Sequence, residues 1–141
     1  LNLDGGIMVT GSHNPPEYNG FKISVGKDTI HGEDIQRIKE EILKGESVIS
    51  GKIGDIKRYN ITTVYKEYML KEFSYLNDSR FKRLKIVVDA GNGTGGIVAP
   101  EILSAIGCEV TPLYCEPDGN FPNHHPDPTV VEYIHDFIGK T

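Results

Sequence analysis

Near the start of the chain, apolar and polar positions have the spacing of two short β-strands. Residues 7–10 form an apolar run with β-branched side chains, which predicts a buried strand. Apolar and polar side chains alternate in residues 21–25, which predicts a second strand with Lys22 on its polar face. Prolines and glycines between the two runs favour a turn. A hairpin-like return would bring Lys22 back over Ser12.

The next part of the chain has helical spacing and then loses any pattern. Residues 31–44 are expected to form a helix that ends at Gly45, with acidic side chains in its first turn. Its apolar stripe, interpreted as core packing, consists of Ile35, Ile38, Ile42 and Leu43. Residues 45–61 are rich in glycine and polar side chains and are interpreted as a linker, with a domain boundary near residue 57. Another helix is expected to start at residue 62 or 63.

The second half of the chain alternates between strand and helix patterns. Residues 84–90 and 108–115 are expected to be strands, and residues 97–106 are expected to be the helix between them. Such a β-α-β unit should have parallel strands joined by a right-handed crossover.

A last helix is predicted from capping-box spacing, with Thr129 as the N-cap and Glu132 three residues later. It should end at Gly139, and its inward-facing residues are expected to be Val131, Ile134 and Ile138. Together the elements predict the α/β class: fragments of two mixed-sheet α/β domains, residues 1–57 and 58–141, each with helices packed on its sheet.

Composition narrows the possible partners. Of the 141 residues, 38% are hydrophobic, which is enough for a core, and the formal net charge is −5 without a basic cluster, which argues against nucleic acid. No apolar run has the length that spans a membrane, and no signal peptide is visible. Cys108 and Cys115 lack a Cys-x-x-Cys pattern and point to free thiols in a reducing compartment, hence a cytoplasmic protein.

The loop after the first strand combines groups that suit phosphate chemistry. Ser12 offers a hydroxyl, which needs activation to act as a nucleophile, with the imidazole of His13 beside it and the ammonium of Lys22 within reach. Two potential cations suit a phosphate group, and Gly11 leaves room for a bulky group on the serine oxygen. Taken singly, each of these residues is more often just part of a polar loop.

This loop, Gly-Ser-His-Asn-Pro-Pro-Glu-Tyr-Asn-Gly-Phe-Lys from Gly11 to Lys22, resembles the phosphoserine loop of the α-D-phosphohexomutases. It is most similar to the bifunctional phosphomannomutase/phosphoglucomutase branch. The segments Val-Val-Asp-Ala-Gly-Asn-Gly, starting at Val87, and residues 112–128 resemble the second domain of the same family. The resemblance implies that residues 1–57 are the C-terminal part of domain I, and residues 58–141 the N-terminal and central part of domain II.

The resemblance also implies a reaction and roles for individual residues. Ser12 would carry the phosphoryl group, Gly11, His13 and Asn14 would form its loop, and Lys22 would stabilise charge near the transferring phosphate. The expected reaction interconverts hexose 1-phosphate and hexose 6-phosphate through a hexose 1,6-bisphosphate, and demands in-line geometry and charge neutralisation. The expected cofactor is Mg²⁺, bound by Ser12 through its phosphate.

Other motifs of that family do not occur in this sequence. The metal loop Asp-Gly-Asp-x-Asp-Arg is missing and is expected beyond residue 141, and the chain starts at Leu1 without an initiator methionine. The phosphate on Ser12 would be the only metal ligand in this chain, which is too little for Mg²⁺, an ion that is bound by six oxygens, even when waters are counted. We therefore expect a piece of a mutase that is inactive alone and, because its sheets would have unpaired edges, prone to associate.

The glycine-rich turn at residues 91–96 offers an alternative from another class. Gly91, Gly93 and Gly96 fit the dinucleotide pattern G-x-G-x-x-G, and Glu116 lies where a ribose-binding acid would be. Against it, Asp89 places negative charge where a pyrophosphate would approach, and the resembled family uses this turn structurally. A third alternative is a non-catalytic fragment that keeps the fold.

The proline-rich loop at residues 118–128 contains a possible metal-binding group. His124, His125 and Asp127 are close in sequence, but adjacent histidines on an extended segment point to opposite sides. Hydrogen bonding that shapes the loop is the better interpretation.

Overall fold

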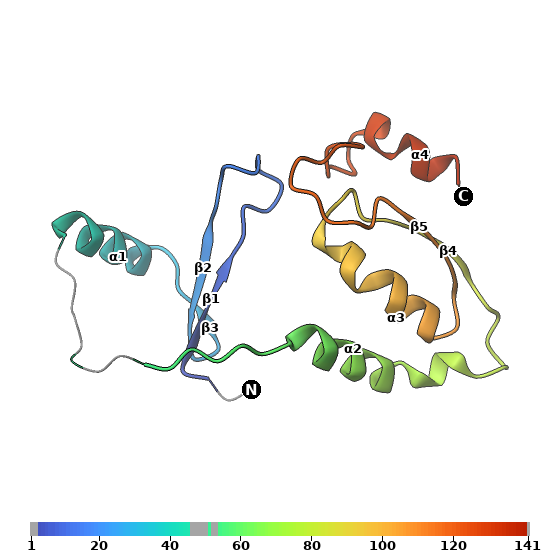
Figure 1. Ribbon diagram of the computed structural model, residues 1–141, viewed down its shortest axis with the longest axis horizontal. Helices are drawn as coiled ribbons and strands as arrows, with labels where there is room; N and C mark the ends of the chain where they lie inside the picture. Colours follow the sequence, from blue (N-terminus) through green and yellow to red (C-terminus); the bar gives the residue numbers. More distant parts are fainter. Residues whose placement is uncertain (1–2, 46–50, 52–53, 141) are drawn as a thin grey trace. The chain divides into compact units, whose positions relative to one another are not determined.

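The computed structural model describes residues 3–45, 51 and 54–140. The chain forms two compact units, Leu1–Lys57 and Arg58–Thr141 (Figure 1). Within the predicted linker, residues 46–50 and 52–53 lie outside the described residues, and residues 54–60 have no regular secondary structure. None of the helices in these described ranges has the length and apolar character needed to cross a membrane.

The first unit is built on an antiparallel sheet of β1 (Gly5–Val9), β2 (Phe21–Val25) and β3 (Asp28–Thr29), in that order. The predicted hairpin is confirmed, since β1 and β2 pair in antiparallel fashion with Val9 opposite Phe21. The backbone of Lys22, however, lies opposite Met8 rather than over Ser12 as expected. The prediction of a buried strand is wrong, because all of β1 is exposed and Ile7 keeps 66% of its surface. A small sheet with one helix has too little material to cover both of its faces.

Helix α1 (Glu33–Lys44) starts two residues later than predicted. Its acidic first turn and its end at Gly45 are confirmed, since Gly45 has a φ of 68° and its N–H donates to the carbonyl oxygen of Ile42. The apolar stripe is not core: none of its residues is buried, and Ile42 and Leu43 are largely exposed.

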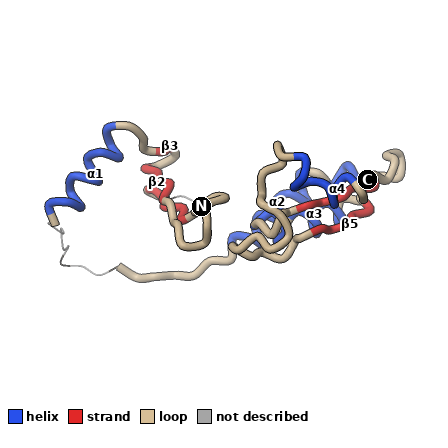
Figure 2. Tube along the Cα trace, turned by 90° about the horizontal axis from the view of Figure 1, so that it is seen from above, coloured by secondary structure: helices blue, strands red, loops and turns tan. Residues whose placement is uncertain are grey.

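The second unit contains α2 (Ile61–Glu72), β4 (Lys85–Asp89), α3 (Ala99–Ala105) and β5 (Glu109–Leu113), coloured by type in Figure 2. The β-α-β prediction is confirmed: β4 and β5 are parallel, from Lys85 opposite Glu109 to Asp89 opposite Leu113. Among the described residues, the buried hydrophobic core consists of Ile102 and Ile106 on and just after α3. The α/β fold class is therefore confirmed, as a strand-helix arrangement in both units.

Two helix starts differ from the predictions because side chains nearby form other hydrogen bonds. Helix α2 begins after Asn60, whose side chain accepts a hydrogen bond from the Thr63 N–H at 3.4 Å. The capping box at Thr129 is wrong: its N–H and hydroxyl both donate to the Asp127 carboxylate, at 3.0 and 2.6 Å. A hydroxyl used in that turn does not cap a helix.

The C-terminal segment is a 3-10 turn, Val131–Ile134, followed by α4 (His135–Ile138), and it ends at Gly139 as predicted. Of the three residues predicted to face inward, Ile134 is confirmed, since it lines a cavity beside β4 together with Phe137. Val131 and Ile138 are exposed instead. The 3-10 turn rotates the side chains by a different angle per residue than an α-helix would, which changes the face that turns inward.

Candidate functional site

The loop between β1 and β2 is held closed by its own backbone. The Thr10 N–H donates to the Gly20 carbonyl oxygen at 2.9 Å, which extends the hairpin ladder by one bond beyond β1. Inside the loop, the Asn14 N–H donates to the Gly11 carbonyl oxygen at 3.0 Å, and the Tyr18 N–H donates to that of Pro15 at 2.9 Å. The segment that carries Ser12 is therefore an ordered loop at the end of a hairpin.

Glycine at position 11 is required by the close approach of the two sides of this loop. A Cβ atom on Gly11 would lie 2.7 Å from the carbonyl oxygen of Tyr18, closer than real Cβ atoms come to an oxygen. The expectation from the sequence was room for a group on the serine. The space beside Gly11 is taken by the backbone of Tyr18, so the glycine also permits the loop's fold.

Ser12 has an unusual backbone conformation for a residue with a side chain. Its φ is 55°, in the left-handed region that few non-glycine residues adopt. Its N–H donates to the hydroxyl oxygen of Thr10 at 3.0 Å, and its own Oγ lies 3.2 Å from Nδ1 of His13. The side chain is exposed, so the hydroxyl is open to a reactant while the imidazole is within hydrogen-bonding distance of it.

The structure places the other predicted site residues at different distances from Ser12. His13 contacts it directly, and Asn14 supports the loop through its backbone. Lys22 lies opposite Met8 in the sheet, next to a shallow depression that Gly6 and Ser24 also line. The sheet register brings its backbone beside β1 rather than beside Ser12.

Thr10 was not singled out in the sequence, yet it fixes the Ser12 backbone. The signal that could have found it is a hydroxyl two residues before a turn residue, a spacing at which serine and threonine side chains commonly bond to the backbone. Its contact with the Ser12 N–H stabilises the left-handed conformation.

The glycine-rich turn of the second unit uses its amide groups internally. The N–H groups of Gly91, Asn92 and Gly93 donate to the Asp89 carboxylate and to the carbonyl oxygens of Tyr114 and Ala90. A dinucleotide site needs such amides free to bind phosphate. The Asp89 carboxylate, moreover, would face a pyrophosphate. The turn therefore does not support the dinucleotide alternative.

Asn92 joins three segments of the second unit. It is buried, with 7% of its surface exposed. Its side-chain nitrogen donates to the Glu116 carbonyl oxygen at 2.8 Å, and its side-chain oxygen accepts from the Asn123 amide at 2.8 Å. Every one of these groups is satisfied within the protein, which is the pattern of a structural turn.

The histidines of the 118–128 loop shape that loop, as predicted. Nε2 of His124 lies 3.0 Å from both carboxylate oxygens of Asp89, whereas the His125 ring stacks on Phe121 and Tyr133 with centroids at 6.3 and 5.8 Å. The two rings thus serve different partners. Within the described parts of the chain there is no group of three histidine, cysteine or acidic residues that could hold a metal ion.

Comparison with known proteins identifies the class of this chain. Residues 63–141 match the family model "Phosphoglucomutase/phosphomannomutase, alpha/beta/alpha domain II", and residues 1–48 match that of "alpha/beta/alpha domain I". The chain belongs to the phosphoglucomutase/phosphomannomutase family, as the resemblance of its loops indicated.

Individual relatives agree with that assignment. The chain is 45% identical over 135 residues to a phosphomannomutase/phosphoglucomutase of Pseudomonas aeruginosa, covering 96% of the chain, and 44% identical over 134 residues to a phosphoglucomutase of Neisseria gonorrhoeae, covering 94% of the chain. The structure of a phosphoglucomutase/phosphomannomutase family protein from Burkholderia thailandensis superposes with a TM-score of 0.83 at 40% identity, over 98% of this chain and 29% of that one. The chain spans 28% of the length of each of the two curated relatives.

Proposed function

We propose that the protein containing this chain is an isomerase of carbohydrate metabolism that interconverts hexose 1-phosphate and hexose 6-phosphate. The observation that carries the proposal is the exposed Ser12 hydroxyl, 3.2 Å from the His13 imidazole, in a segment that matches domain I of a mutase family. Residues 1–57 are then the C-terminal part of domain I and residues 58–141 the N-terminal and central part of domain II. The 141-residue piece alone is inactive.

In the proposed reaction, Ser12 carries a phosphoryl group and passes it to a free hydroxyl of the bound hexose phosphate. The phosphorus–oxygen bond to Ser12 breaks while a bond to the sugar oxygen forms, and the proton lost by the sugar hydroxyl ends on the Ser12 oxygen, so that a hexose 1,6-bisphosphate and a free Ser12 hydroxyl result. In the second transfer, the Ser12 oxygen takes the other phosphoryl group, and the Ser12 proton ends on the sugar oxygen from which that group departs. Because the loop fixes the Ser12 backbone in advance, less conformational freedom is lost when the phosphoryl group is brought into line with the sugar hydroxyl.

The neighbouring residues have distinct roles in this proposal. The His13 imidazole lies at the Ser12 oxygen, where it can donate to or accept from it according to its tautomer. During the transfer, the long, flexible side chain of Lys22 extends to the loop, where its positive charge neutralises the transferring phosphate. Gly11 and Asn14 keep the loop closed through its backbone.

Mg²⁺ is the cofactor expected for the whole protein. The described residues of this chain do not form its site, because they contain no cluster of three acidic, histidine or cysteine side chains. The phosphate on Ser12 would be one ligand, so the remaining ligands would have to come from other residues of the protein and from water.

We also place the protein in the cytoplasm. Cys108 and Cys115 are both free thiols. Burial raises the pKa of the Cys115 thiol, which keeps it protonated and less reactive. Two unpaired cysteines suit a reducing compartment.

Phosphorylation of Ser12 is the test. The full-length protein, first treated with phosphatase, is incubated with glucose 1,6-bisphosphate, and its intact mass should rise by about 80 Da, the mass of a phosphoryl group. The Ser12→Ala variant should take up no label, whereas Ser79→Ala, which removes an exposed serine from a turn of the second unit, should behave as the wild type. An unlabelled wild type, or label that persists in Ser12→Ala, would contradict the proposal and favour a non-catalytic use of the fold.

A further inference from the structure

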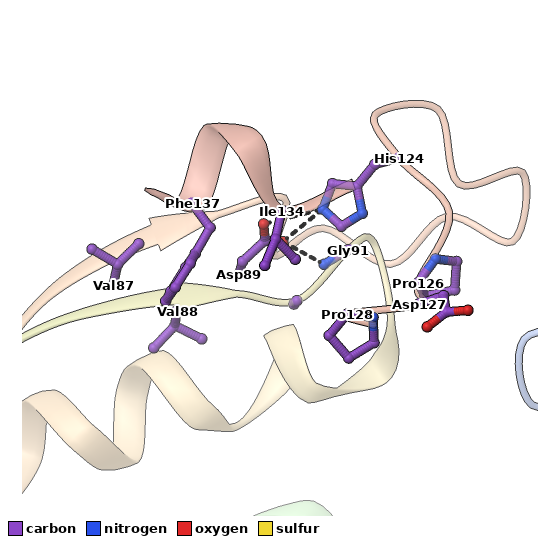
Figure 3. Close-up of a pocket in the computed structure, with 11 residues that line it drawn as sticks. Val87, Val88, Asp89, Gly91, His124, Pro126, Asp127, Pro128, Ile134 and Phe137 are labelled. Atoms are coloured by element: carbon purple, nitrogen blue, oxygen red, sulfur yellow. Dashed lines mark hydrogen bonds and ion pairs between the residues drawn. The ribbon is translucent and has the colours of Figure 1, made fainter. Parts of the chain in front are cut away.

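The second unit has a cavity of about 520 Å³ at the carboxyl end of β4 (Figure 3). Ile134 and Phe137 from the C-terminal segment lie over the strand, and His124 reaches in from the 118–128 loop toward Asp89. The side chains of His124 and Asp89 keep only 13% and 9% of their surface exposed. This is therefore a shielded pair of ionisable groups, and the proposed phosphoryl transfer does not use it.

Both ring nitrogens of His124 face groups that can only accept a hydrogen bond. Nε2 lies 3.0 Å from each carboxylate oxygen of Asp89, and Nδ1 lies 3.0 Å from the carbonyl oxygen of His125. A neutral imidazole has a single N–H and can serve one of these acceptors, whereas the imidazolium form has two. The observed geometry is satisfied on both sides only by the doubly protonated ring.

We propose that His124 is held as an imidazolium cation that pins the 118–128 loop to the end of β4, and that this anchor weakens when the ring loses its proton. The pin connects two segments that lie 35 residues apart in sequence. The same Asp89 carboxylate accepts from the Gly91 N–H at 2.9 Å, so the glycine-rich turn shares the anchor.

The surroundings of His124 favour its positive charge. The ionisable groups around it are Asp89 at the end of β4, Tyr114 after β5, Asp136 in α4, and His125 and Asp127 within the loop. Tyr114 meets the His124 ring edge-on, with centroids 5.5 Å apart, and donates its hydroxyl proton to Asp136. Among these described residues, acidic groups thus predominate around the ring, and none is a lysine or an arginine.

Opposing influences act on the pKa of His124. Burial, the largest of them, lowers it, but the hydrogen bonds to the His125 carbonyl and to Asp89, together with the charges of Asp89 and Asp136, raise it above its ordinary value. Because the folded-state pKa is the higher one, the stabilisation is complete below the pKa of an unfolded histidine, about 6.5. It is lost as the pH rises through the folded-state pKa.

The test is a histidine titration followed by NMR on the full chain. Its outcome does not depend on whether Ser12 is phosphorylated. We expect both ring nitrogens of His124 to carry protons at pH 6. In the near-isosteric Asp89→Asn variant, whose amide oxygen can still accept from Gly91, the His124 midpoint should fall by about one pH unit or more. The NMR resonances of His31, an exposed residue of the other unit, should be unchanged by the substitution. A neutral His124 ring at pH 6, or an unchanged midpoint in Asp89→Asn, would overturn the proposal.

A stability profile separates this anchor from ordinary packing. The thermal midpoint of the second unit should be lower in His124→Gln than in the wild type at pH 6, and the difference should shrink toward pH 9. The His31→Gln variant should follow the wild type throughout. A difference that stays constant with pH would mean that His124 acts through packing alone, which would also overturn the proposal.

Discussion

At the scale of single residues, the candidate site depends on a strained serine. Ser12 adopts a left-handed φ, which costs about 1–2 kcal/mol for a residue with a Cβ atom. The Thr10 hydroxyl and the closed loop offset this cost. Strain that is held by several hydrogen bonds is common at functional positions, because it fixes the reactive atom before the substrate arrives.

Replacing Gly11 by alanine should disturb this loop. The added methyl group would meet the Tyr18 carbonyl oxygen at 2.7 Å, so the backbone has to shift, and Ser12 shifts with it. We expect several-fold slower phosphoryl uptake from glucose 1,6-bisphosphate and a stability loss of about 1–3 kcal/mol, measured by mass spectrometry and chemical denaturation. Gly54→Ala is the control, because a methyl group there meets no atom within 4 Å. Equal behaviour of the two variants would contradict the role of Gly11.

At the scale of elements, the sequence patterns predicted the positions of strands and turns more accurately than the helix caps and the sides of helices that face inward. The strand β2 and the β-α-β order depend on neighbours in sequence, and both were predicted correctly. The helix cap at Asn60 depends on which nearby side chain accepts the hydrogen bond of the first helical turn, and the position of Phe137 depends on which side chain fills the cavity. The spacing of residues in the sequence does not decide either choice.

The 3-10 turn Thr94–Ile97, just before α3, makes a close contact with the segment that follows β5, and a substitution can test it. A Cβ atom on Gly96 would lie 2.0 Å from the Cys115 carbonyl oxygen, whereas one on the adjacent Gly95 meets nothing within 4 Å. Gly96→Ala should therefore destabilise the second unit by about 1–3 kcal/mol, while Gly95→Ala should change its stability little. Denaturant unfolding of both variants measures the difference. A harmless Gly96→Ala would mean that the two segments are packed less tightly than described.

At the scale of the whole molecule, two units each leave much apolar surface uncovered. In the first unit, the register puts Ile7, Val9, Phe21 and Val25 on one face of the sheet, and all four are at least 60% exposed. Contiguous exposed apolar surface promotes association. The strand β1 also lies at the edge of its sheet, where unpaired backbone groups can bind another strand.

The 141-residue chain on its own should therefore self-associate with rising concentration, measured by sedimentation velocity. Ile7→Lys places a charge on the apolar face and should reduce association several-fold. Met8→Lys is the matched control, because Met8 is also exposed but lies on the opposite face of the same strand. If both variants reduce association equally, the edge of β1 rather than this face is responsible.

The sequence by itself determined the local features of this protein: the hairpin with its serine loop, the parallel β-α-β unit and the membership of a mutase family. These follow from spacings and motifs that are contiguous in the chain. Only the tertiary structure decided that His124 meets Asp89, that Asn92 joins Asn123 and that Gly96 meets Cys115. Such partners lie 19 to 35 residues apart, and their distances are set by how strands, helix and loop pack together, which no local pattern contains.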